Sequence, residues 1–125
     1  MREAAESLIE KVIGRAIEVH RVLGPGLQEG IYECALQHEL LLNGIVSERQ
    51  VGIDVTYKGI VLGMGFRVDL LVEQCLPLEL KAVEHLTDVH RAQLISYLKV
   101  LQLKRGLLLN FNSVLLKAGI KRVSI

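Results

Sequence analysis

Hydrophobic residues in the first forty positions recur with the period of an α-helix. Over residues 3–22 this period predicts an amphipathic helix, whose apolar positions are Ala5, Leu8, Val12, Ala16, Val19 and Leu23. Gly24-Pro25-Gly26 follows and predicts the end of the helix, because proline cannot continue a helix and glycine tolerates a reversal of the chain. A second helix is expected over residues 28–42, along a stripe made of Ile31, Ala35, His38 and Leu42.

From Ile45 onward apolar and polar residues alternate, which is the period of a β-strand. Residues 45–57 predict one or two short strands broken near Gly52, and Lys58-Gly59 predicts a two-residue hairpin turn. After this turn, strands are expected over residues 60–64, 66–72 and 78–83, with a further turn at 73–76. Pro77 is expected to be the first residue of its strand, because proline lacks the N–H that a central strand needs.

The last third of the chain returns once to helical spacing. A helix is expected over residues 88–102 with Thr87 as its N-cap, followed by strands over residues 106–111 and 119–123. This order of helices, meander, helix and returning strands is typical of an α/β fold with a mixed β-sheet flanked by helices. Residues 1–125 are expected to form one domain, because this length is enough for one core and too short for two.

The composition narrows the class of protein. Fifteen basic and fourteen acidic residues give a formal charge of +1, so bulk charge alone would not hold nucleic acid. No uncharged apolar segment of membrane-spanning length and no signal peptide are visible. Cys34 and Cys75 lack C-x-x-C spacing, which favours reduced thiols. A soluble cytoplasmic protein is therefore expected.

Charged residues interrupt two apolar, strand-like segments between positions 67 and 84. Glu79 and Lys81 are two apart and share a face of their strand, and pairing with the preceding strand would bring Asp69 beside them. Charge among leucines and valines is costly unless it is paired or bound to a metal. Carboxylates from two neighbouring strands suit Mg²⁺, with Mn²⁺ as an alternative. A surface ion pair is the other interpretation of these residues.

Two further groups could complete such a site. Gln93 and Tyr97 are four apart on the third helix and lie on one face, where they could reach a phosphate or a base. An amphipathic boundary pair is the alternative. Glu29 stands in the first turn of the second helix, where exposed N–H groups favour a carboxylate. It is either a third acid aimed at a metal, with Tyr32 on the same side, or a charge that stabilises the helix end.

Motifs for other chemistries are missing from the sequence. The four histidines form no compact ligand set, which argues against zinc. The chain also lacks a phosphate-binding loop, a dinucleotide-binding glycine motif and a serine-nucleophile motif, so no organic cofactor is expected.

Four segments occur in the order of a known family. The segment VIGRAIEVHRVLGPGLQEGIYECAL, which carries Gly26, Glu29 and Tyr32, resembles the signature of the GxxExxY protein family. The segments FRVDLLVE, LELKAVE and HRAQLISYL resemble its later motifs, and the resemblance covers residues 9–123. Because this family belongs to the PD-(D/E)xK nuclease superfamily, the resemblance implies a restriction-endonuclease-like core.

The resemblance also implies a role for each matching residue. Asp69 and Glu79 would be metal-binding acids, and Lys81 would be the lysine of the ExK element. Glu29 would be the acid that a helix contributes, and Gln93 with Tyr97 would form the QxxxY element. Pro77 and Gly65 depart from the pattern of the family. Pro77 stands where relatives usually carry a β-branched residue. These departures concern the strand geometry and not the ligands.

The expected function is Mg²⁺-dependent hydrolysis of phosphodiester bonds in nucleic acid, with DNA favoured over RNA. The acids would hold the cation, and Lys81 would position or activate the attacking water. The rival hypothesis is a catalytically silent module that binds nucleic acid or protein, which the near-neutral charge and the few aromatic residues support. The small size favours a homodimer, because one copy offers little surface to hold a duplex.

Overall fold

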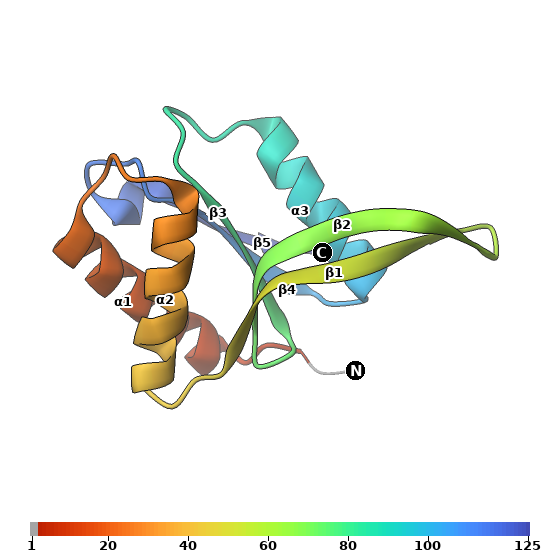
Figure 1. The fold of residues 1–125 in the computed structure, drawn as a ribbon, viewed down its shortest axis with the longest axis horizontal. Coiled ribbons are helices and arrows are strands. Elements are labelled where there is room, and N and C mark those ends of the chain that lie inside the picture. The colour runs from red at the N-terminus through yellow and green to blue at the C-terminus, as the bar shows by residue number, and fades with distance from the viewer. Residues whose placement is uncertain (1–2) are drawn as a thin grey trace.

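A computed structural model describes residues 3–125 as a mixed sheet with helices on both faces (Figure 1). The elements in chain order are α1 (Glu6–Leu23), α2 (Glu29–Leu42), β1 (Ser47–Tyr57), β2 (Ile60–Val72), β3 (Leu76–Lys81), α3 (Asp88–Leu101), β4 (Arg105–Asn110), the 3₁₀ helix η1 (Leu116–Gly119) and β5 (Ile120–Ser124). The strands lie in the order β1-β2-β3-β4-β5, and neighbours are antiparallel except β3 and β4, which are parallel. The predicted α/β fold with a mixed sheet is confirmed.

The sheet buries a different hydrophobic cluster on each face. On one face, α1 and α2 pack against the strands through residues such as Val12, Leu36 and Leu78. On the other face, α3 packs through Leu94 and Leu98 against strand residues. Alternation along each strand sends neighbouring side chains to opposite clusters, so the central strands are apolar on both faces. Within residues 3–125, no helix is long and apolar enough to cross a membrane.

The helix ends agree with the sequence patterns to within three residues. Thr87 is the N-cap of α3, as predicted: its hydroxyl accepts from the His90 N–H at 3.4 Å, and its own N–H donates to His90 Nδ1 at 3.1 Å. This reciprocal pair satisfies two N–H groups at the start of the helix.

The stripe predicted for the second helix, in contrast, is wrong. The residues that α2 buries are Tyr32, Glu33, Leu36 and Leu40. Ile31 and Leu42, which the prediction placed on the stripe, are 45% and 67% exposed. The apolar residues of this helix are distributed around most of its circumference, so periodicity alone could not choose the buried face. The actual rotation turns Glu33 toward the interior.

The middle of the sheet also departs from the predicted boundaries. Neither Gly52 nor Gly65 interrupts its strand, because β1 and β2 are both continuous through these positions. Pro77 is the second residue of β3 and not the first. The strand tolerates it there because pairing with β4 begins one residue later, at Leu78, so the parallel ladder requires no N–H from Pro77.

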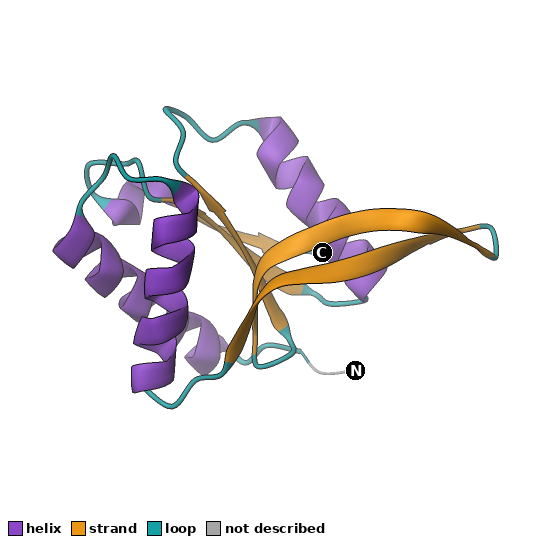
Figure 2. Ribbon diagram, in the orientation of Figure 1, coloured by secondary structure: helices purple, strands orange, loops and turns teal. Residues whose placement is uncertain are grey.

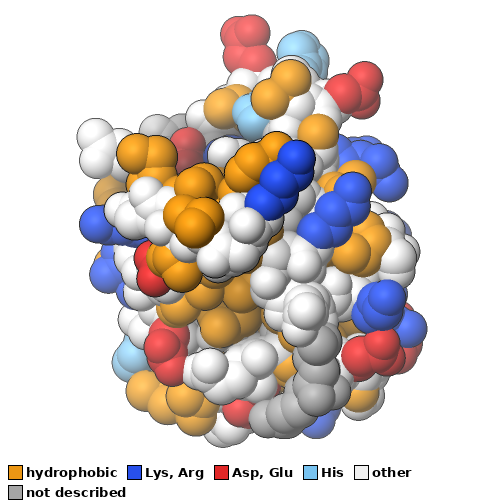
Figure 3. Space-filling model, turned by 90° about the vertical axis from the view of Figure 1, so that its right-hand side faces the viewer, with side chains coloured by type: hydrophobic (Ala, Val, Ile, Leu, Met, Phe, Trp, Pro, Cys, Tyr) orange, Lys and Arg blue, Asp and Glu red, His pale blue; other side chains and the backbone are white. Residues whose placement is uncertain are grey.

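β1 and β2 continue beyond the sheet as a two-stranded arm (Figure 2). β2 pairs with β3 only from Leu70 to Val72, whereas its pairing with β1 reaches Ile60. The exposed large apolar residues of the arm are Tyr57, Ile60, Val61, Leu62 and Met64. Figure 3 looks at the molecule from the side toward which the arm extends and shows hydrophobic side chains beside Lys and Arg atoms.

Candidate active site

The candidate site lies where β2 diverges from β3. The antiparallel pairing of the two strands stops at Leu70 and Leu78, although both strands continue. Beyond this point two carboxylates take over as acceptors for backbone N–H groups: Leu80 N donates to Asp69 Oδ2 at 2.8 Å, and Asp69 N donates to Glu79 Oε1 at 3.4 Å. The end of the ladder therefore fixes Asp69 and Glu79 side by side, as strand alternation predicted.

Glu79 is the more deeply buried acid of this pair. Glu79 is only 4% exposed. Burial, the largest cause, raises its pKa to about 8 together with the Asp69 charge and a hydrogen bond with the Asp69 carboxylate. The Asp69 N–H and the Lys81 charge lower the pKa in part. Without a bound cation Glu79 therefore keeps its proton at neutral pH, because two adjacent carboxylates with little solvent cannot both ionise.

Lys81 lies two residues after Glu79 and therefore on the same face of β3. It is half-buried at the end of the strand, level with Asn110 of β4, and its carbonyl accepts from Phe111 N at 2.8 Å. Its backbone is thus fixed by the parallel ladder. The Lys81 charge lowers the Glu79 pKa in part, which agrees with their shared face of the strand.

α3 brings Tyr97 and Gln93 to the same place from the other layer. The charges of Glu79 and Asp69 raise the Tyr97 pKa after burial, the largest cause, and a hydrogen bond from Gln93 lowers it in part. The Tyr97 ring stacks on Phe66 of β2, with centroids 3.9 Å apart and planes at 2°. These two contacts hold the phenol beside the acids, so the helix contributes two neutral hydrogen-bonding groups to the site.

Within residues 3–125, Glu29 makes no hydrogen bond or ion pair with Asp69 or Glu79, so its role as a third metal ligand stays a prediction. It is exposed at the first turn of α2, as a helix-terminal charge would be. One turn later Glu33 is only 5% exposed, and its Oε1 accepts from Gln50 Nε2 at 2.7 Å. The same amide reaches Asp69 Oδ1 at 3.4 Å. Sequence reasoning missed Glu33 and Gln50; the one available signal was the four-residue step from Glu29 along the helix.

Tyr32 has a structural role in the loop that precedes α2. It is completely buried, its hydroxyl donates to the Gly24 carbonyl at 2.5 Å and accepts from Leu27 N at 3.0 Å, and its ring stacks on Phe111 at 4.6 Å. Gly26 in the same loop has φ of 98°, a conformation that favours glycine. This tyrosine therefore holds the reversal between α1 and α2 and does not contact the acid pair in these interactions.

The acid pair Asp69 and Glu79 suits a hard divalent cation. Among residues 3–125 no group of three or more His, Cys, Asp and Glu side chains is arranged to hold a metal ion. Two carboxylates with several retained waters are a common Mg²⁺ environment in proteins. The burial of Glu79 beside Asp69 favours a cation here, because a cation would offset both the burial and the Asp69 charge that raise the Glu79 pKa.

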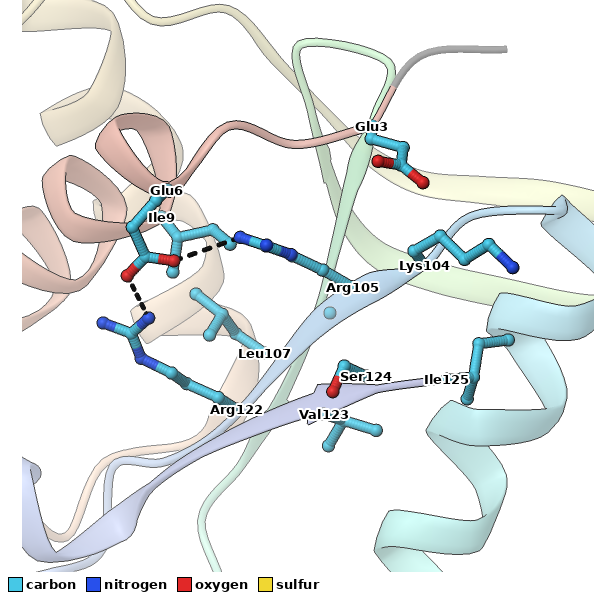
Figure 4. Close-up of a pocket in the computed structure, with 11 residues that line it drawn as sticks. Glu3, Glu6, Ile9, Lys104, Arg105, Leu107, Arg122, Val123, Ser124 and Ile125 are labelled. Carbon is cyan, nitrogen blue, oxygen red and sulfur yellow. Dashed lines mark hydrogen bonds and ion pairs between the residues drawn. The ribbon is translucent and has the colours of Figure 1, made fainter.

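A separate pocket with a cavity volume of about 470 Å³ lies between α1 and the β4–β5 edge (Figure 4). Its charged lining is organised around Glu6, whose carboxylate pairs with Arg105 at 3.1 Å and also with Arg122. None of the acids of the candidate site lines this pocket. The two ion pairs connect the start of α1 to β4 and β5, which is a structural explanation for this charge cluster.

Comparison with known proteins gives a family for the chain. A model of the PD-(D/E)XK nuclease superfamily matches residues 6–123, which includes every element from α1 to β5 except the last residue of β5. No curated protein and no solved structure matches at a significant level. With nearly the whole sequence matched, and with a mixed sheet that places Asp69, Glu79 and Lys81 at one strand divergence, the chain belongs to the PD-(D/E)XK nuclease superfamily.

Proposed function

We propose that the protein is a divalent-metal-dependent nuclease of the GxxExxY type that hydrolyses phosphodiester bonds of DNA. Nucleases of the superfamily generally depend on a divalent metal. The observation that supports the proposal best is the Asp69–Glu79 pair, in which burial and mutual repulsion raise the Glu79 pKa to about 8. Two adjacent carboxylates, one of them buried, repel each other when both ionise, and they are good ligands for a divalent cation.

Asp69 and Glu79 would hold the ion, Mg²⁺ or Mn²⁺. When bound, this ion supplies a more acidic attacking water and neutralises charge that develops on the phosphate. Lys81, on the Glu79 face, is proposed to orient the water and to stabilise the phosphate oxygens. The attacking water would release a proton to solvent as its oxygen bonds to phosphorus; one P–O ester bond breaks, and the leaving oxygen takes a proton from solvent. Gln93 and Tyr97 are proposed to donate hydrogen bonds to the non-bridging oxygens.

A cleavage assay with matched variants tests the proposal. Labelled single- and double-stranded DNA and RNA are incubated with the wild type in Mg²⁺ or Mn²⁺, and with Asp69→Ala and Lys81→Ala. Both substitutions should abolish cleavage while the variants remain folded, because they remove a ligand and the activating charge. Lys99→Ala, at an exposed lysine on α3, is the control and should cleave like the wild type. Unchanged cleavage by Asp69→Ala and Lys81→Ala would contradict the proposal.

The rival function is a binding module without catalysis. The exposed apolar residues of the β1–β2 arm and the formal charge of +1 favour it, because large exposed apolar side chains often mark a contact surface. A folded protein that retains nucleic acid on a filter but releases no product with any metal would support this rival.

We further propose that the protein acts in the cytoplasm as a homodimer. The exposed Cys34 thiol is compatible with a reducing compartment. The dimer is proposed because a protein of 125 residues with formal charge +1 offers little surface for a duplex. A monomeric mass in light scattering at high protein concentration would contradict the dimer.

A further inference from the structure

Gln50 has an unusual backbone conformation for a residue within a strand. Its φ is 54°, in the left-handed region, although β1 continues on both sides of it. A residue with a side chain reaches this region at an energetic cost, and such strain persists where the surroundings hold it. Arg49 pairs with Leu70 and Val51 pairs with Val68, so Gln50 lies level with Asp69. The strained residue is therefore directly opposite a proposed metal ligand.

The left-handed conformation has a visible consequence for the side chains. Neighbouring residues of a regular strand point to opposite faces. Here Arg49 and Gln50 both reach the buried Glu33: Arg49 Nη2 lies 3.6 Å from Glu33 Oε2, and Gln50 Nε2 donates to Glu33 Oε1 at 2.7 Å. The strain at Gln50 is thus associated with two adjacent side chains that meet one carboxylate of α2.

The Gln50 amide also contacts Asp69. Nε2 lies 3.4 Å from Asp69 Oδ1, while the other oxygen, Oδ2, accepts from Leu80 N at 2.8 Å. A carboxylate that is held at both oxygens has a fixed plane, whereas one held at a single oxygen can rotate about its last bond. Residues that fix the orientation of metal ligands in this way affect metal affinity without touching the ion.

We propose that Gln50 is a positioning residue that fixes the Asp69 carboxylate for its ion, with Glu33 and Arg49 holding the amide in place. The inference rests on the proposed function for its metal-dependent part. Its structural part, that the amide orients Asp69, can be measured in the protein without any metal.

The variant Gln50→Gly tests the role of the Gln50 side chain without adding backbone strain. Glycine accepts a φ of 54° readily, so this variant removes the amide without imposing a new conformation. Gln102→Gly is a matched control, because Gln102 is the same residue type with a φ of 58° and forms the C-cap of α3. Gln50→Asn is the second variant: asparagine tolerates positive φ and keeps an amide, but it is one methylene too short to reach both carboxylates.

The first readout is the amide proton of Leu80, followed by NMR in the metal-free protein. Asp69→Ala defines its chemical shift and exchange rate when the bond to Oδ2 is lost. Gln50→Gly should move both values toward those of Asp69→Ala, Gln50→Asn should move them part of the way, and Gln102→Gly should leave them unchanged. An unchanged Leu80 amide in Gln50→Gly would overturn the inference, whatever the protein does with metals.

The second readout is the affinity for Mn²⁺, measured by calorimetry. Gln50→Gly should bind Mn²⁺ about tenfold more weakly than the wild type, as is typical for the loss of a residue that orients a ligand, and Gln102→Gly should bind like the wild type. An affinity within twofold of the wild type in Gln50→Gly would overturn the metal-dependent part. If the wild type binds no Mn²⁺ even with a non-hydrolysable DNA oligonucleotide, while the Leu80 amide responds as expected, the proposed function fails and the positioning role stands.

Discussion

Asp69 and Glu79 each interact with the backbone of the neighbouring strand, so that the carboxylates continue the ladder where β2 and β3 diverge. Leu80 N donates to Asp69 Oδ2 at 2.8 Å, and Asp69 N donates to Glu79 Oε1 at 3.4 Å. The same contacts that satisfy backbone N–H groups at the end of the pairing therefore hold two acids together in a buried place. The arrangement that suits a cation therefore costs the metal-free protein stability when both carboxylates ionise.

Glu79 should make the metal-free protein less stable as the pH rises. Because its pKa is raised from 4.5 to about 8 in the folded state, the folded protein binds more protons than the unfolded chain between these values. The free energy of unfolding should therefore fall from pH 4.5 to pH 8, by an amount on the order of 4 kcal/mol. Urea unfolding of wild type and Glu79→Gln at pH 5 and pH 8.5 measures this; the variant should lack this fall and be the more stable protein at pH 8.5. Glu84→Gln, at an exposed carboxylate, should behave like the wild type.

Removal of divalent metal should lower the melting temperature more at pH 8 than at pH 6. Cation binding requires the ionised form of Glu79, and below pH 8 it must displace the proton that burial keeps there. Saturating Mn²⁺ should raise the melting temperature strongly at pH 8 and weakly at pH 6, and a chelator should reverse both shifts. A larger shift at pH 6 than at pH 8 would show that the ion binds elsewhere.

Gly65→Ala should disrupt the base of the arm. A Cβ at this position would lie 1.8 Å from the Ile53 carbonyl oxygen, which is backbone and cannot move independently. The expected destabilisation is at least about 2 kcal/mol, as for overpacked interiors. Gly52→Ala in the partner strand is the control, because nothing lies within 4 Å of an added Cβ there. Equal melting temperatures for the two variants would mean that β1 and β2 are not in this close register.

Tyr97→Phe should distinguish the role of the Tyr97 hydroxyl from the role of its ring. The ring stack on Phe66 at 3.9 Å remains possible in this variant, so its melting temperature should stay close to that of the wild type. If the hydroxyl donates to the phosphate, cleavage should fall by roughly a hundredfold. Phe66→Leu, which removes the stacking partner, should lower the free energy of unfolding by about 1 kcal/mol. Wild-type cleavage by Tyr97→Phe would leave Tyr97 with a packing role only.

The fold and the meeting of the two acids could be predicted because they depend on local pattern. Alternation along the strands is enough to place Glu79 and Lys81 on one face, and adjacent pairing of β2 and β3 brings Asp69 to Glu79. The position of Tyr97 near the acids similarly follows from the helix that comes after β3. Their catalytic roles stay predictions.

The contribution of α2 could not be predicted, because tertiary contacts decide which face of that helix is buried. Tyr32 binds the preceding loop and packs on Phe111, which turns Glu33 inward and leaves Ile31 exposed. The left-handed conformation of Gln50 has no sequence signal either, since glutamine is not a residue that favours it. The link from Glu33 to Asp69 is therefore visible only in the structure.

The most direct test of the account is a calorimetric titration of Mg²⁺ and Mn²⁺ into the wild type and into the double variant Asp69→Ala, Glu79→Ala. Both proteins are measured alone and with a non-hydrolysable DNA oligonucleotide, because substrate phosphates often complete such sites. We predict binding at one or two sites in the wild type and none at those sites in the double variant. Equal binding by both proteins, or no binding by the wild type even with the oligonucleotide, would contradict the assignment of Asp69 and Glu79 as the metal centre.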